Sequence, residues 1–201
     1  MQKVMITGIA GGFGKPTALA LLDKGYHVAG SVRYRGGKNA DTVAELETAG
    51  ATVVELDITD TTSAEGGITQ AIERLGGLDV LFNNAGIGSY GIQELMSPED
   101  MAQVFDVNVM GVQRVMRAVL PCMRAQGRGT VIYTSSLIGR IATPFYGTYS
   151  ASKWALEAIV ECYRTELSGF GVESCIIEPG AMPTAFFDGM LMPKDADRAA
   201  Q

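Results

Sequence analysis

The segment Val4-Met-Ile-Thr7-Gly8-Ile-Ala-Gly11-Gly12-Phe-Gly14 decides the fold that this sequence predicts. A short apolar, strand-like run passes directly into a glycine-rich loop, and a helical pattern follows. Glycine allows the tight turn and lets a pyrophosphate approach the N–H groups at the positive end of the helix. The spacing is not G-x-G-x-x-G, because three residues separate the first and second key glycines. We expect a dinucleotide-binding loop, with a plain strand-to-helix turn as the alternative.

The rest of the chain repeats this alternation of strand and helix. Strands are predicted at Lys3–Thr7, His27–Val32, Thr52–Leu56, Val80–Asn83, Gly129–Tyr133 and Val172–Ile177, and helices at 13–24, 39–49, 62–75, 98–125 and 148–168. Strands rich in Val and Ile that alternate with helices imply right-handed crossovers and a parallel sheet. The expected fold is one α/β domain over residues 1–201, a Rossmann-like doubly wound parallel sheet flanked by helices on both faces, in three α/β/α layers.

Composition excludes several classes of protein. The chain has 201 residues, 47% of them hydrophobic and 19% charged, which suits one soluble globular domain. A net charge of −6 without a Lys/Arg-rich run argues against nucleic acid as a partner. No signal-peptide pattern and no membrane-length apolar stretch is present, so we expect a cytoplasmic protein without a membrane span. Three cysteines without ligand spacing and the single histidine, His27, predict no metal site and no His-dependent triad.

The end of the second strand bears on the choice of nicotinamide cofactor. NAD binding usually needs an Asp or Glu there to hold the ribose 2′-hydroxyl. The sequence is Ser31-Val32-Arg33-Tyr34-Arg35, which has no acid. Arg33 can meet a 2′-phosphate, so NADP(H) is the preferred cofactor and NAD(H) the second choice. The alternative is that Arg33 and Arg35 are solvated loop residues.

Two further strand ends carry candidate cofactor residues. After the third strand, Asp57 could hydrogen-bond an adenine amino group and Ile58 could pack on the ring, while Asp60 or a neighbouring hydroxyl could cap the next helix. The fourth strand ends in Asn83-Asn84-Ala85-Gly86, where small residues leave room for a ligand at the switch point of the sheet. Asn83 is as well suited to joining neighbouring strands.

Tyr149 and Lys153 form a candidate acid/base pair. They are four residues apart on a predicted helix and therefore share a face. A nearby ammonium favours phenolate and lowers a pKa that is normally about 10. Ser136 ends the fifth strand thirteen residues before Tyr149, so the two hydroxyls could face each other at the carboxyl edge of the sheet. Such a pair also occurs on many helices without a catalytic role, and serines at strand ends are commonly caps.

Taken in order, these motifs resemble the short-chain dehydrogenase/reductase family from residue 7 to residue 184. The matching positions are Thr7-Gly-x-x-x-Gly12-x-Gly14, Asp57, Asn83-Asn-Ala-Gly86, Asn108, Ser136, Tyr149-x-x-x-Lys153 and Pro179-Gly180-x-x-x-Thr184. The resemblance implies that Tyr149 is the general acid/base, that Lys153 holds the nicotinamide ribose and lowers the pKa of Tyr149, and that Ser136 positions the substrate oxygen. It also implies that Asn108 supports a proton-relay water, a role that coincides with bending the predicted helix around a bound water.

A nicotinamide cofactor and a carbonyl or alcohol substrate follow from this resemblance. Hydride would pass between nicotinamide C4 and a carbonyl carbon while Tyr149 gives or takes the proton on oxygen. The expected cofactor-binding residues are Thr7, Gly8, Gly12, Phe13, Gly14, Arg33, Asp57, Ile58, Asn84, Ala85, Gly86, Tyr149, Lys153, Pro179, Gly180 and Thr184. Pro179–Thr184 would lie beside the nicotinamide carboxamide.

The candidate substrate pocket is apolar and aromatic. Its expected residues are Ser136, Ile138, Tyr146, Met182 and Phe186, with Tyr90, Leu137, Phe145 and Phe187 as further candidates. No Arg or Lys is obviously aimed at a carboxylate or phosphate, so we expect a hydrophobic alcohol or ketone, steroid- or lipid-like. The alternative is that these aromatic residues belong to the core.

One stretch departs from the family pattern. The family usually continues through a lid helix and a seventh strand, whereas Ala185–Gln201 supplies only the start of a substrate loop. We therefore expect the lid helix and last strand to be lacking. That argues against the usual tetramer and leaves a homodimer through helices 98–125 and 148–168.

The favoured function is an NADP-dependent oxidoreductase that acts on CH–OH and C=O groups. The first alternative is a non-catalytic NADP-binding or redox-sensing protein on the same fold, because fold does not imply function. The second is an isomerase or dehydratase that borrows the nicotinamide. The set of Ser136, Tyr149 and Lys153 favours the enzyme, because a binding module has no need of the phenol.

Overall fold

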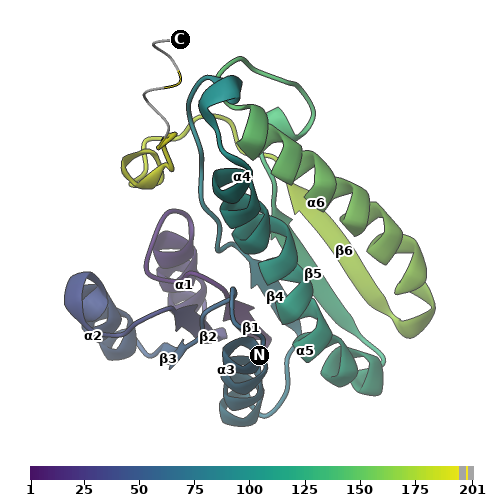
Figure 1. The fold of residues 1–201 in the computed structure, drawn as a ribbon. Coiled ribbons are helices and arrows are strands. Elements are labelled where there is room, and N and C mark those ends of the chain that lie inside the picture. The colour runs from purple at the N-terminus through teal and green to yellow at the C-terminus, as the bar shows by residue number, and fades with distance from the viewer. Residues whose placement is uncertain (195–197, 199–201) are drawn as a thin grey trace.

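A computed structural model describes residues 1–194 and 198, which form a six-stranded parallel sheet between two layers of helices (Figure 1). The strands are β1 (Lys3–Ile6), β2 (His27–Val32), β3 (Thr52–Glu55), β4 (Val80–Asn83), β5 (Gly129–Thr134) and β6 (Val172–Ile177). Their order in the sheet is β3-β2-β1-β4-β5-β6, and all neighbouring strands are parallel. The prediction of a Rossmann-like doubly wound sheet is confirmed.

The helices between the strands are α1 (Gly14–Asp23), α2 (Ala40–Thr48), α3 (Thr61–Leu75), α4 (Pro98–Phe105), α5 (Gly111–Gln126) and α6 (Gly147–Glu166). The helix predicted at 98–125 is divided, because a π-helical turn over Asp106–Met110 joins α4 to α5. Helix α4 begins as its sequence suggests: Ser97 and Asp100 cap each other reciprocally, with Pro98 at the first position. In the described part of the chain, no helix combines the length and apolar character that crossing a membrane requires.

Two apolar clusters pack on opposite faces of the sheet. Met5 faces the cluster formed with α3, α5 and α6, whereas its neighbours Val4 and Ile6 face the cluster formed with α1 and α2. This alternation follows from the two-residue period of a strand. Figure 1 shows α3, α5 and α6 on one side of the sheet and α1 and α2 on the other. Helices therefore flank both faces, as predicted.

Helix cover is incomplete over β6. Its residues alternate between buried and exposed, and Glu173, Cys175 and Ile177 are exposed on the face opposite α6. No helix of the described residues lies over that part of the sheet. On the second face, the main helix contacts of the described residues are those of α1 with β2 and of α2 with β3.

Gly30, in the middle of β2, sets how closely the glycine-rich loop packs on the sheet. A Cβ atom at this position would overlap the side chain of Ile9, which is fully buried. Ile9 also donates its N–H to the Ser31 carbonyl at 2.9 Å. The glycine-rich loop therefore packs on the sheet through the Ile9 side chain, which has room there because residue 30 is glycine.

We predict that Gly30→Ala lowers the free energy of unfolding by about 1–3 kcal/mol, the usual effect of overpacking a core. The measurement is urea unfolding followed by circular dichroism. Gly66→Ala in α3 is the matched control, because a Cβ there meets nothing within 4 Å. It should raise stability by roughly 0.5–1 kcal/mol. Equal stability of Gly30→Ala and the parent protein would contradict the packing described.

Candidate active site

The ends of β1 and β4 are joined where the strand order reverses. The hydroxyl of Thr7 accepts hydrogen bonds from the N–H groups of Asn84 and Ala85, both at 3.0 Å. The Asn84 amide donates in return to the carbonyls of Thr7 at 3.0 Å and Gly8 at 3.2 Å. In a doubly wound sheet this is the place where a ligand binds. The predicted loop residues and the Asn84-Ala85-Gly86 segment are thus brought together.

The glycine-rich loop has a geometry that favours glycine at three points, one of which is Gly12 with a φ of 47°. Gly8 has a φ of 67°, and a Cβ there would lie 3.1 Å from the Ala85 Cα. A Cβ at Gly14 would collide with the Gly8 carbonyl. Helix α1 follows directly and no side chain caps its N-terminus at Phe13. Its first N–H groups can therefore meet an anion, which fits the pyrophosphate of a dinucleotide.

The two arginines after β2 have different surroundings. Arg35 donates to the Val53 carbonyl at 2.6 Å and pairs with Glu47 at 2.8 Å. Arg33 is exposed and forms no ion pair with any described residue. Burial raises the pKa of Asp57, but hydrogen bonds from Thr59 and the charges of Arg33 and Arg114 outweigh it and hold that pKa below its usual value. Arg33 is therefore the arginine left to meet a ligand near Asp57.

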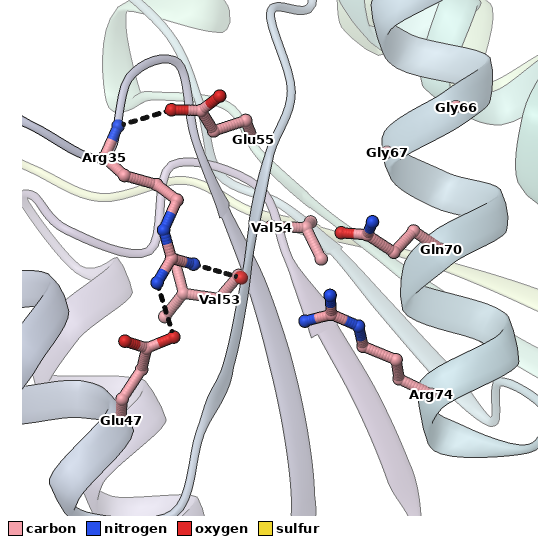
Figure 2. Close-up of a pocket in the computed structure, with 9 residues that line it drawn as sticks. All are labelled: Arg35, Glu47, Val53, Val54, Glu55, Gly66, Gly67, Gln70 and Arg74. Carbon is pink, nitrogen blue, oxygen red and sulfur yellow. Dashed lines mark hydrogen bonds and ion pairs between the residues drawn. The ribbon is translucent and has the colours of Figure 1, made fainter.

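A pocket of about 390 Å³ lies beside β3, the edge strand of the sheet. Figure 2 shows it between the side chains of Arg35 and Glu47 on one side and those of Gln70 and Arg74 on α3. None of the predicted site residues lines this pocket. It is a groove at the sheet edge, apart from the predicted site residues.

Asp57, Ile58 and Asp60, which follow β3, contact neighbouring residues of the protein. The Asp57 carboxylate accepts hydrogen bonds from the N–H and hydroxyl of Thr59, at 2.9 and 2.7 Å. Asp60 caps α3 by accepting from the Ser63 N–H, which is the capping alternative. Ile58 is only 9% exposed and packs into the core against Gly111. Packing of Ile58 on an adenine ring stays a prediction.

Tyr149 and Lys153 lie one turn apart on α6 and are both buried. The Lys153 Nζ donates to the Thr134 carbonyl at 2.7 Å and lies 5.6 Å from the centre of the Tyr149 ring. Burial lowers the pKa of Lys153 to about 8, an effect that the negative charge of Glu157 partly offsets. Burial raises the pKa of Tyr149 to about 12, although the Ser136 hydroxyl opposes this. The expectation that the pKa of Tyr149 is lowered is therefore wrong for this structure, because burial raises that pKa more than the Ser136 hydroxyl lowers it.

Asn108 is buried in the π-helical turn and holds the loop after β4. Its Oδ1 accepts from the Ile87 N–H at 2.9 Å, and its Nδ2 donates to the Ile87 carbonyl at 2.9 Å and the Ser152 hydroxyl at 3.0 Å. Ser152 lies on α6 next to Lys153. The side chain of Asn108 thus has a structural role between this loop and α6, and its part in a proton relay remains a prediction.

The predicted nicotinamide loop begins at the end of β6. The Pro179 carbonyl accepts from the Leu137 N–H at 2.9 Å, which places this loop beside the turn after Ser136. The hydroxyl of Thr184 accepts from the Phe186 N–H at 3.4 Å, and Gly180 is exposed. The three predicted residues therefore lie along a segment that starts at the same sheet edge as Ser136.

The segment after Thr184 folds over Tyr149. Leu191 donates its N–H to the Gly88 carbonyl at 2.9 Å and accepts from the Tyr90 N–H at 3.0 Å. The Phe186 ring lies 5.6 Å from that of Tyr149. Of the predicted substrate loop Ala185–Gln201, residues 195–197 and 199–201 lie outside the described residues.

The aromatic candidates form two groups near this segment. Tyr90 contacts Phe145 and Tyr146, with ring centres 5.8 and 5.1 Å apart, and Phe186 contacts Phe187 at 5.7 Å. Phe145 and Phe187 are 51% and 43% exposed, which argues against the core alternative for these two rings. Of the remaining candidates, Leu137 and Met182 are exposed, and the Ile138 carbonyl accepts a hydrogen bond from the Trp154 indole.

Sequence reasoning missed Ser135 and Glu157, which lie behind Ser136 and Lys153. Both are buried, and the Ser135 hydroxyl donates to the Glu157 carboxylate. The sequence did carry a signal for Glu157, because this residue continues the four-residue spacing from Tyr149 and Lys153.

Within the described residues, no cluster of His, Cys, Asp and Glu could hold a metal ion.

Comparison with known proteins gives the family of the chain. The profile of the short chain dehydrogenase family matches residues 2–192. The chain belongs to the short-chain dehydrogenase family. The structure is similar to that of a short-chain dehydrogenase from Streptomyces avermitilis, with a TM-score of 0.88 and 31% identity, over 100% of this chain and 76% of the other.

Two sequence relatives are similar over nearly the whole of this short-chain dehydrogenase. YbbO of Escherichia coli K12, an uncharacterized oxidoreductase, is 37% identical over 94% of this chain and 70% of its own length. The 3-ketodihydrosphingosine reductase of Bacteroides thetaiotaomicron is 36% identical over 93% of this chain and 66% of its own length. The chain thus spans about two thirds of these relatives.

The lowered pKa of Lys153 predicts how stability depends on pH. The unfolded chain binds a proton at this lysine up to about pH 10.5 and the folded chain only up to about pH 8, so stability rises with pH between these values. From about pH 7.5 to about pH 9.5, wild type should gain about 2 kcal/mol over Lys153→Met, which lacks this titration. Urea unfolding of both proteins along the pH series measures the difference. If the free energies of unfolding of the two proteins changed with pH in parallel, the lowered pKa of a buried Lys153 would be contradicted.

Proposed function

We propose that this short-chain dehydrogenase transfers hydride between NADP(H) and a hydrophobic ketone or alcohol, with Tyr149 as the general acid/base. The proposal is supported by the loop after β4, which lies between the glycine-rich loop and Lys153: a Cβ at Gly8 would lie 3.1 Å from the Ala85 Cα, and one at Gly86 3.7 Å from the Lys153 Nζ. Ser136 interacts with Tyr149, one turn from Lys153 on α6. NAD(H) is the second choice of cofactor. A non-catalytic protein that binds NADP is the alternative to an enzyme.

The nicotinamide would supply or accept the hydride. Tyr149 carries its proton at neutral pH, because burial holds its pKa near 12, so it can donate that proton to the oxygen of a ketone. The hydroxyl of Ser136 would hold the same oxygen. Lys153 carries its positive charge one turn away and stabilises the phenolate that remains. The segment carrying Phe186 excludes water from Tyr149.

Arg33 supports the preference for NADP(H). It is exposed beside Asp57, whereas Arg35 is held by Glu47 and Val53. A guanidinium without an ion-pair partner can bind a 2′-phosphate by paired hydrogen bonds.

The aromatic groups around Tyr149 support a hydrophobic substrate. Phe186 lies over Tyr149, and Tyr90 joins Phe145 and Tyr146 nearby. The relative named 3-ketodihydrosphingosine reductase supports a long-chain ketone as the first class to try. We also propose a cytoplasmic homodimer through α4, α5 and α6, which is supported by the exposed side chains of Met110 and Trp154.

Calorimetry with NADPH and NADH tests the proposal, followed by absorbance at the reduced-nicotinamide band with a series of aliphatic ketones of increasing length. Binding of NADPH with oxidation by a ketone is the expected result. Binding without oxidation by any ketone would favour the non-catalytic alternative. Lack of binding to either cofactor would contradict the proposal.

Tyr149→Phe should reduce turnover by at least about a hundredfold, the usual contribution of general acid–base catalysis, because phenylalanine has no proton to give. The affinity for NADPH should change little. Tyr163→Phe is the matched control: Tyr163 is on the same helix, but its hydroxyl donates to Gln113 at 2.6 Å. Turnover by Tyr149→Phe at the rate of the control would remove Tyr149 from its proposed role.

Arg33→Ala should weaken NADPH binding by roughly tenfold or more and leave NADH binding nearly unchanged, because only NADPH carries the 2′-phosphate. Calorimetry with both cofactors measures this. Arg35→Ala is the control, since its partners are Glu47 and Val53 and it should affect both cofactors alike. Equal losses for the two cofactors in Arg33→Ala would show that Arg33 does not select between them.

A further inference from the structure

Behind the pair of Tyr149 and Lys153 lies a buried carboxylate that the proposed reaction does not use. Glu157 is one turn beyond Lys153 on α6 and only 3% exposed. Tyr149, Lys153 and Glu157 thus follow one another at four-residue spacing on one helix face. Burying a carboxylate is costly unless partners compensate for its lost hydration, so its partners show what it does.

One oxygen of Glu157 binds the end of β5. Its Oε1 accepts a hydrogen bond from the Ser135 hydroxyl. Ser136 follows Ser135 directly, just after β5, and its backbone is extended. Ser135 faces α6 at Glu157, and Ser136 interacts with Tyr149. Because the two serines are adjacent, the hydrogen bond at Ser135 holds the backbone that carries Ser136.

The other oxygen meets a cation. The Glu157 Oε2 lies 2.5 Å from the Arg140 Nε, an ion pair whose angles do not make an aligned hydrogen bond. Arg140 also pairs with Glu178, which follows β6, at 3.0 Å. The turn between Ser136 and Arg140 packs closely on the carboxylate, because a Cβ at Gly139 would collide with the Glu157 Oε1. The four charges of Lys153, Glu157, Arg140 and Glu178 alternate in sign.

We propose that Glu157 is a positioning residue of the active site, which holds Ser135 and the Leu137–Gly139 turn against α6 and supplies the negative charge beside the Lys153 ammonium. The effect of Glu157 on catalysis rests on the proposed function. The negative charge opposes the effect of burial on Lys153, whose pKa would otherwise fall further. The phenolate of Tyr149 then forms next to a cation that keeps its proton.

Other charged groups on the elements packed against α6 have partners of their own or face away. Asp100 of α4 is used in the helix cap, and Asp106 of the π-helical turn pairs with Arg114 at 2.7 Å. On α6 itself, Glu161 pairs with Arg164, and on β6 Glu173 is exposed. Tyr133 of β5 is buried, and its hydroxyl donates to the Met116 sulfur. Glu157 is therefore the carboxylate that acts on Lys153.

The test is a titration of the Lys153 side chain by NMR in the protein alone, with Lys153→Met identifying its signal. Glu157→Gln should lower the pKa of Lys153 by about one pH unit or more, the usual effect of losing an adjacent opposite charge. Arg140→Gln should shift the pKa of Lys153 the other way, because it removes a positive charge. Glu161→Gln is the control, since Glu161 is an exposed carboxylate one turn further along α6. It should leave the titration unchanged.

The outcomes separate this inference from the proposed function. An unchanged Lys153 titration in Glu157→Gln, or a fall in Arg140→Gln, would overturn the inference even if the wild type reduces ketones. If Glu157→Gln does not fold, a rise in Arg140→Gln supports the inference and no change overturns it. In an active wild type, Glu157→Gln should move the alkaline limb of the rate profile to lower pH, whereas a purely structural role would lower the rate equally at every pH. The NMR titration needs no turnover, so it remains decisive if no ketone is reduced.

Discussion

The hydrogen bonds between the ends of β1 and β4 are the constraint on which the rest of the site depends. Thr7 and Asn84 satisfy each other's polar groups at the point where the chain leaves β1 for one face of the sheet and β4 for the other. The backbones approach closely there because Gly8 has no side chain to hold them apart from Ala85. The open N-terminus of α1 and the loop after β4 both take their positions from this junction.

Much of the fold could be predicted from sequence because its determinants are local. Runs of Val and Ile between glycine turns predicted the six strands to within one residue, and the helix predicted at 98–125 begins where α4 begins. The π-helical turn was missed because Asn108 finds its partner, Ile87, about twenty residues earlier in the chain. The spacing of apolar residues within a helix gives no sign of a contact with a residue outside that helix.

The same distinction applies to the candidate site. The residue types and their order in the chain were readable, and the structure places them at one edge of the sheet. Their environment was not: Tyr149 is buried partly by Phe186, which is distant in sequence, so its pKa moved opposite to the expectation from Lys153 alone. Glu157 was overlooked because an acid on a helix usually faces water. Here its carboxylate is buried, accepts a hydrogen bond from Ser135 and forms an ion pair with Arg140.

The π-helical turn also sets the angular phase of the long helical segment from α4 to α5. Each residue of an α-helix advances it by about 100°, so one residue more than an α-helix would hold displaces every later side chain around the axis. Asn108 faces Ile87 and Ser152 within that turn, while Val112 and Met116 beyond it face the core. The segment can thus turn Asn108 toward the site while Val112 and Met116 pack in the core. In an uninterrupted α-helix these three residues, spaced four apart, would share one face.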